Sequence, residues 1–66
     1  MSWRPEVIAD DSGEWVGNAL RFATRREADA YLSELAANWT QVVKTRAVEV
    51  FEPVNCSWAN GRVLNL

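Results

Sequence analysis

Histidine is absent from this sequence, and cysteine occurs only once, at Cys56. A single cysteine cannot form an intrachain disulfide, so the chain is not a small scaffold stapled by disulfides. Without histidine it lacks the commonest metal ligand and the commonest general base. The sequence therefore predicts no metal site and no cofactor, and its stability has to come from an apolar core, from oligomerisation, or from both.

Long apolar runs and an excess of basic residues are also missing. No stretch approaches the roughly 18 apolar residues of a membrane span, and no apolar run of signal-peptide length follows the first charged residue. We therefore expect a cytoplasmic protein with no membrane contact. Seven basic and nine acidic residues give a net charge of −2, so the overall composition provides no electrostatic footprint for nucleic acid.

The residues that are present favour folding into one small domain over residues 1–66. Hydrophobic residues make up 48% of the chain, and four of them are tryptophans, which each bury a large area. A chain of this length buries only about 60% of the surface that its unfolded form exposes, so we expect marginal stability.

The first part of the chain predicts a β-hairpin. Residues 5–9 and 14–23 are β-rich, and the turn formers Asp10 to Gly13 separate them. By the period-two rule, the second strand places Val16, Leu20 and Phe22 on the core face and Trp15, Ala19 and Arg21 on the opposite face. Gly17 indicates a bulge or a close approach of another backbone.

A helix over residues 25–38 is the next predicted element. Thr24 at the N-cap and Glu27 three residues later form the capping-box pattern. An apolar stripe at helical spacing follows, made of Ala28, Leu32, Leu35 and Trp39. We expect this stripe, including Trp39, to face the core.

The last third is β-rich again. Residues 42–51 alternate as a strand, and Asn60-Gly61 lies between two strand-like runs within 55–64, which is a strong signal for a type I′ hairpin. The predicted fold is therefore α+β: β-β-α-β with a terminal β-hairpin, and one helix packed on one face of an antiparallel sheet.

Catalytic or metal-binding chemistry finds little support in the residues. Asp10, Asp11 and Glu14 resemble part of a cation loop, but an EF-hand counted from Asp10 would need a glutamate at its twelfth position, where Arg21 stands. Glu49 and Glu52 are three residues apart in a strand, so they point to opposite faces. Cys56 has no histidine to activate it, and a structural thiol is expected. We therefore expect no enzyme.

The tryptophans point instead to contacts. Trp39 falls on the helical stripe, whereas Trp15 lies opposite the predicted core face and Trp58 lies in the last hairpin. A sheet covered by one helix leaves its other face open, and Trp and Arg are enriched at interface hot spots. The candidate interaction surface is therefore Trp15, Arg21 and Trp58. Two arrangements remain open: the face is free, or the terminal hairpin folds over it.

Two resemblances accompany these patterns. Residues 12–24 with Glu27-Ala28, and residues 52–55 followed by Trp58 and Gly61-Arg62, are similar to a group of short bacterial proteins known as conserved hypothetical proteins. That likeness implies a bacterial or phage-related origin and brings no activity or functional residue. Phe22 to Ala28, after a Trp in an early strand, also resembles the sheet-plus-helix DNA-binding modules of the AP2 and integrase N-terminal type.

We therefore expect a small interaction module that works through protein contacts, with an unknown protein or a second copy as its partner. The alternative function is weak nucleic-acid binding through the open sheet face. Clustering of Arg4, Arg21, Lys44 and Arg46 on one face would favour that alternative. For a homodimer, the open face carrying Trp15 is the expected interface, ahead of the charged 42–51 strand edge.

Overall fold

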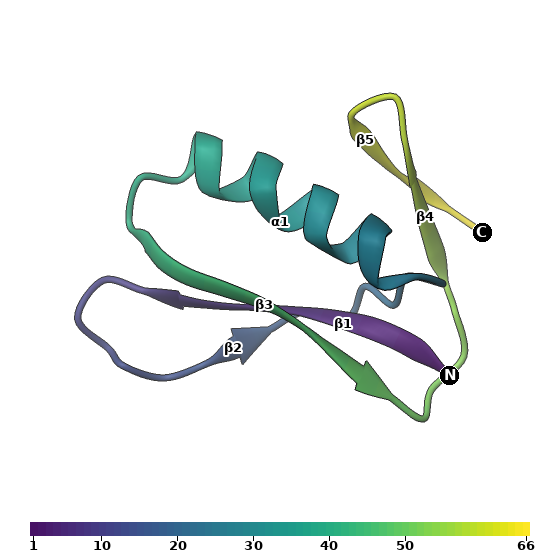
Figure 1. Cartoon of the computed structure of the whole chain (residues 1–66), viewed down its shortest axis with the longest axis horizontal. Helices are drawn as coiled ribbons and strands as arrows, with labels where there is room; N and C mark the ends of the chain where they lie inside the picture. The colour runs from purple at the N-terminus through teal and green to yellow at the C-terminus, as the bar shows by residue number, and fades with distance from the viewer.

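The computed structural model describes all residues, 1–66, and its elements confirm the predicted α+β fold. They are β1 (Ser2–Ala9), β2 (Val16–Gly17), α1 (Arg25–Asn38), β3 (Val42–Val50), β4 (Cys56–Ala59) and β5 (Arg62–Asn65). The first three strands form an antiparallel sheet in the order β2-β1-β3, and β4 and β5 form a separate hairpin. α1 packs on one face of the larger sheet (Figure 1).

β1 is the central strand although it contains a proline. Trp3 exchanges both of its backbone hydrogen bonds with Phe22, at 2.8 and 3.0 Å, on the side of the sheet where β2 lies. Because backbone directions alternate along a strand, the nitrogen of Pro5 points to that same side. No strand pairs with β1 at that point, because residues 18–21, between Gly17 and Phe22, lie outside the sheet. Pro5 therefore costs the sheet no ladder hydrogen bond.

α1 begins and ends where the sequence predicts. Thr24 is the N-cap, and its hydroxyl accepts from the backbone N–H of Glu27 at 3.2 Å. The carboxylate of Glu27 bonds the Thr24 hydroxyl and also accepts from the backbone N–H of Trp58 at 3.0 Å. Glu27 thus joins the first turn of the helix to the terminal hairpin. No helix in the structure combines the length and the apolar character that crossing a membrane requires.

The predicted strand over residues 14–23 is wrong in its extent. Only Val16 and Gly17 pair with β1, and Phe22 returns as an isolated bridge to Trp3. Between them, the side chain of Asn18 accepts from the backbone N–H of Leu20 at 3.0 Å. Asparagine side chains compete in this way with ladder hydrogen bonds, so the chain turns out of the sheet after β2.

The core is small and lies between the sheet, the helix and the hairpin. Its fully buried residues include Phe22, Ala28 and Cys56, with Leu32 at 2% exposure. Two predicted core positions differ from expectation: Val16 is 51% exposed, and Trp39 is 37% exposed because it lies beyond the last helical turn as the C-cap. The apolar stripe of α1 is therefore buried at Ala28 and Leu32 and becomes exposed toward the helix C-terminus.

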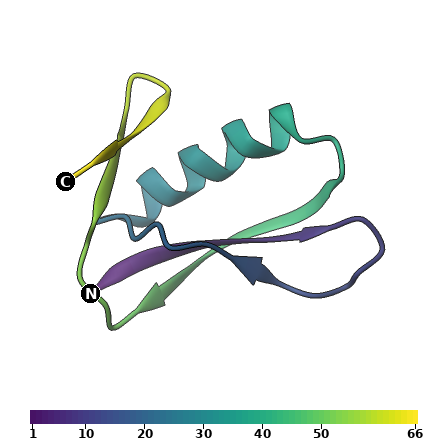
Figure 2. The same ribbon diagram turned by 180° about the vertical axis from the view of Figure 1, so that it is seen from behind.

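The terminal hairpin has the predicted turn and lies beside the helix. Asn60 and Gly61 both have positive φ, 53° and 77°, as a type I′ turn requires. β4 contacts α1, and the hairpin stands at the helix N-terminal end in both views (Figures 1 and 2). The hairpin therefore does not cover the sheet face that points away from α1, which decides between the two arrangements left open by the sequence.

We predict that Leu32→Asp unfolds the domain. Leu32 is 2% exposed in the helix–sheet interface, and an unpaired carboxylate there costs on the order of 3 kcal/mol or more, a large part of the stability of a small domain. Circular dichroism during thermal unfolding measures the effect. Ser33→Asp, one position along on the exposed side of the helix, should change stability by no more than about 0.5 kcal/mol; equal melting of both variants would contradict this core assignment.

Gly61→Val should destabilise the hairpin by about 1 kcal/mol or more, because a β-branched residue disfavours the positive φ of 77° found there. A Cβ at this position would meet no atom within 4 Å, so the cost comes from the backbone and not from a clash. Gly61→Asn is the matched control, since asparagine tolerates this conformation, and it should lose much less stability in urea unfolding. Equal losses for the two variants would count against the backbone explanation.

Candidate interaction surface

The face of the sheet that points away from α1, here called the open face, is the candidate functional surface. Pro5 and Val7 line a groove against the helix, so the residues that alternate with them in β1, and their register partners in β3, point the other way. The open face carries Ser2, Arg4, Glu6, Ile8, Trp15, Lys44, Arg46, Val48 and Val50, of which Ser2 is fully buried.

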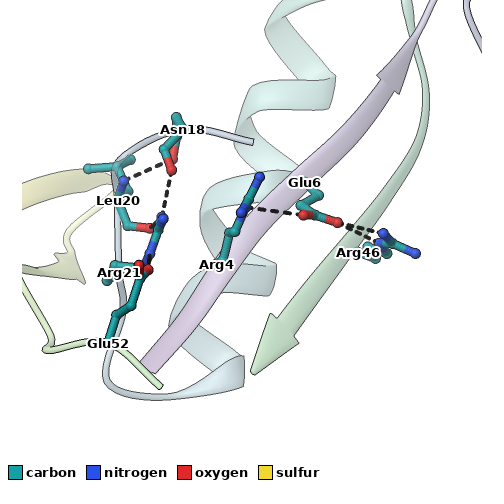
Figure 3. Close-up of polar contacts among 7 residues, drawn as sticks. All are labelled: Arg4, Glu6, Asn18, Leu20, Arg21, Arg46 and Glu52. Carbon is teal, nitrogen blue, oxygen red and sulfur yellow. Dashed lines mark hydrogen bonds and ion pairs between the residues drawn. The ribbon is translucent and has the colours of Figure 1, made fainter. Parts of the chain in front are cut away.

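Glu6 is the centre of this face. Its side chain is only 10% exposed and lies between two arginines (Figure 3). Arg46, its register partner on β3, directs both Nε and Nη2 to Glu6 Oε1 at 2.7 Å. Arg4 Nε lies 3.1 Å from Glu6 Oε2 as an ion pair without hydrogen-bond geometry. A carboxylate this buried needs such partners, because desolvation disfavours an isolated charge.

Trp15 completes the cluster on the same face, from the side of β1 that is opposite β3. The guanidinium carbon of Arg46 lies 4.1 Å from the centre of the Trp15 ring. This is a cation–π contact, which contributes about 0.5–1 kcal/mol at a partly exposed site. Arg46 therefore reaches across β1 and links β3 to the residue that precedes β2.

Arg4 crosses Gly17, which has no side chain. A Cβ at Gly17 would lie 2.5 Å from Arg4 Nε, so the arginine side chain would have to move away. The sequence predicted a bulge or the approach of another backbone here; the structure instead shows the approach of a side chain, and the irregular register lies between Ile8 and Ala9. The missing side chain of Gly17 gives Arg4 its path toward Glu6.

Charge is distributed unevenly between this face and the rest of the protein. The open face holds three of the seven basic residues, Arg4, Lys44 and Arg46, and only one of the nine acidic ones, Glu6. Its net charge is +2, which leaves four basic and eight acidic residues, a net charge of −4, for the remainder of the chain. An acidic protein thus presents one basic face.

Arg21 has a structural role. Its side chain is 14% exposed and pairs with Glu52, and its Nη1 donates to the carbonyls of Asn18 and Leu20 at 2.5 and 2.8 Å. Its backbone is bonded to Asn55 in both directions, at 2.8 and 3.0 Å. These contacts tie the loop before α1 to the segment before β4 (Figure 3).

Trp58 lies on the helix side of the molecule. Its ring meets Tyr31 of α1 edge-on, with centroids 6.0 Å apart, and it packs against the core residues Phe22, Ala28 and Cys56. Of the three residues that the sequence proposed as one surface, Trp15 contacts Arg46 on the open face, Arg21 pairs with Glu52, and Trp58 packs on the helix side. Arg21 and Trp58 instead hold the loop and the hairpin.

The remaining candidate catalytic and metal-binding side chains do not form a site. No three His, Cys, Asp or Glu side chains come together as metal ligands. Cys56 is fully buried, and this burial raises the pKa of its thiol above the ordinary value of 9.0, so the thiol stays protonated at neutral pH. Asp10, Asp11 and Glu14 are exposed in the turn between β1 and β2.

Most contacts on the open face cannot be predicted from the sequence, because they depend on how the strands pair. Arg4 and Glu6 are two residues apart in a strand, a spacing that places both on one face. The 40-residue separation of Glu6 and Arg46, however, is bridged only by the register of β1 against β3. Arg4, Lys44 and Arg46 share the open face through the pairing of β1 with β3, whereas Arg21 pairs with Glu52.

Glu6→Gln should destabilise the domain by about 1–2 kcal/mol, because two arginines lose the carboxylate between them while remaining partly exposed to water. Urea unfolding at neutral pH measures the change. Glu49→Gln is the control, since Glu49 lies exposed on β3 and should give a change within about 0.5 kcal/mol. A loss no larger for Glu6→Gln than for the control would show that the cluster contributes nothing to stability.

Comparison with known proteins assigns this chain to no family. No protein-family model matches the sequence, and no curated protein or solved structure matches the chain. The bacterial origin implied by the sequence resemblance stays a prediction. The function is therefore inferred from the side chains and surfaces of this chain alone.

Proposed function

We propose that this chain is a small interaction module that docks a protein partner on its open face. The observation that carries the proposal is the composition of that face: Trp15 and the aliphatic residues Ile8, Val48 and Val50 are partly exposed among three basic side chains, and neither α1 nor the terminal hairpin covers them. The matching partner has an acidic surface with apolar positions. A bacterial origin, which rests on the sequence resemblance, and the cytoplasmic location expected from the sequence pattern are part of the proposal.

The half-buried ions of this face suit a protein partner. Tryptophan and arginine are the residue types that most often dominate binding energy when a partner excludes water from them. Arg46 is already fixed by Glu6 and by the ring of Trp15, so little side-chain entropy remains for a partner to remove. Lys44 is exposed next to this cluster and is free to pair with a carboxylate. The proposal assigns no catalytic role.

Nucleic-acid binding is the second candidate, favoured by one observation. Arg4, Lys44 and Arg46 share the open face with an aromatic ring, and single-strand binding surfaces combine cations with aromatic rings. Two features rank it lower. Glu6 occupies both arginines, so phosphate would have to compete with a carboxylate already in place, and the rest of the chain carries a net charge of −4 that repels a polyanion.

Charge reversal on the open face tests the protein-docking proposal. Lys44→Glu should abolish specific capture of a partner from an extract of the native host, because it places a carboxylate against an acidic surface. Arg26→Glu makes the same change at an exposed position on α1 and should leave capture intact. Circular dichroism confirms that both variants are folded. Capture that survives Lys44→Glu, or that both variants lose equally, would contradict docking on this face.

Fluorescence anisotropy with labelled single-stranded and duplex DNA tests the second candidate. We expect no affinity tighter than the non-specific range of roughly 10⁻⁴ to 10⁻⁶ M at physiological salt. Binding that is sequence-preferring at nanomolar concentration, and that Lys44→Glu removes while Arg26→Glu does not, would reverse the order of the two functions.

A further inference from the structure

One long strand edge of the protein has no partner. β3 spans Val42–Val50 and pairs only with β1, because the strand order is β2-β1-β3. α1 contacts β3 from one face of the sheet and the hairpin makes no substantial contact with it, so its outer backbone groups stay free. An unpaired edge of this length is a template for pairing with another strand, and proteins cover, charge or pair such edges.

The residues that direct hydrogen-bonding groups outward can be assigned. Trp3 bonds Phe22 on the β2 side, so Arg4, the next residue, points its backbone groups at β3 and pairs with Val48. The positions of β3 that alternate with Val48, namely Thr45, Ala47 and Glu49, therefore direct their N–H and C=O groups away from the sheet.

The regular part of this edge is symmetric. The register irregularity between Ile8 and Ala9 leaves Val43 without a partner on β1, so the regular stretch is Lys44–Val50, and Ala47 is its midpoint. Directly beyond the two ends lie Val43, 62% exposed, and Phe51, 89% exposed. An antiparallel pair centred on Ala47 would use the whole regular stretch and bring Val43 of one copy against Phe51 of the other at each end.

Shifted two-fold registers fit less well. Centring on Arg46 places two guanidinium groups directly opposite each other, which is destabilising. Centring on Val48 sets Lys44 against Glu52, which is already engaged by Arg21. Centring on Ala47 instead puts Thr45 opposite Glu49 and both Lys44 and Arg46 opposite valines.

We propose that β3 pairs with β3 of a second copy, antiparallel about a two-fold axis at Ala47, to form one continuous sheet. The inference goes beyond docking on the open face and does not depend on it. It also differs from the homodimer expected from the sequence, in which the open faces meet. A two-fold contact buries the same patch on both copies, and the open face has a net charge of +2, so two such faces repel.

Light scattering coupled to size exclusion at high micromolar protein tests the pairing. We expect twice the 7.5 kDa mass of the chain. Phe51→Asp should give a folded monomer, because it removes the apolar contact at both ends of the junction. Leu66→Asp is the control, an equally drastic change at another exposed apolar residue, 79% exposed, and it should leave the dimer intact.

Three outcomes overturn the proposal. The first is a wild-type monomer at high micromolar concentration. The second is a dimer that Phe51→Asp leaves unchanged while Trp15→Ala converts it to a folded monomer, which would place the interface on the open face. The third is hydrogen exchange in which the amides of Thr45, Ala47 and Glu49 gain no protection as the protein concentration rises. Protection of these three amides is the expected result. This measurement uses the wild-type protein, so it tests pairing of the β3 edge even if a variant fails to fold.

Discussion

The backbone and ring of Phe22 join the three parts of this fold. Its N–H and C=O both bond Trp3 at the start of β1, and its backbone forms a second bridge, to Cys56 of β4. Its ring is fully buried, with its centroid 5.5 Å from that of Tyr31 on α1. Sheet, helix and hairpin therefore meet at one residue. In a chain with so little core and no disulfide, this junction is what makes separate local elements into one structure.

Local rules predicted the elements that depend on a few neighbouring residues. The helix follows from Thr24 and Glu27, and the terminal hairpin follows from Asn60-Gly61, where the required positive φ values occur. The predicted second strand is too long, because alternation of apolar residues gives no sign that the Asn18 side chain accepts from the backbone N–H of Leu20 and ends the strand. The helical period of the stripe predicts Trp39 in the core, but the helix ends at Asn38 and Trp39 is 37% exposed.

Relations across the sheet could not be read from the sequence. The buried carboxylate of Glu6 is stable because the register of β1 against β3 places Arg46 opposite it, and because Gly17 leaves room for Arg4. Each of these residues alone looks like an ordinary surface residue. Arg21 lies in the segment that leaves the sheet after Gly17 and returns only at Phe22, and it pairs with Glu52 instead of Glu6.

The open face and the β3 edge are geometrically compatible uses of one sheet. A two-fold axis that pairs antiparallel edge strands runs normal to the sheet, so it keeps both helices on one side and both open faces on the other. The joined sheet would then present the basic, tryptophan-containing face twice, side by side. A partner with two acidic segments would bind the second site as an intramolecular step and gain avidity without any new contact. Self-pairing of the open faces would remove that surface, so the charge that keeps two copies from meeting face to face also keeps the face available to a partner of opposite charge.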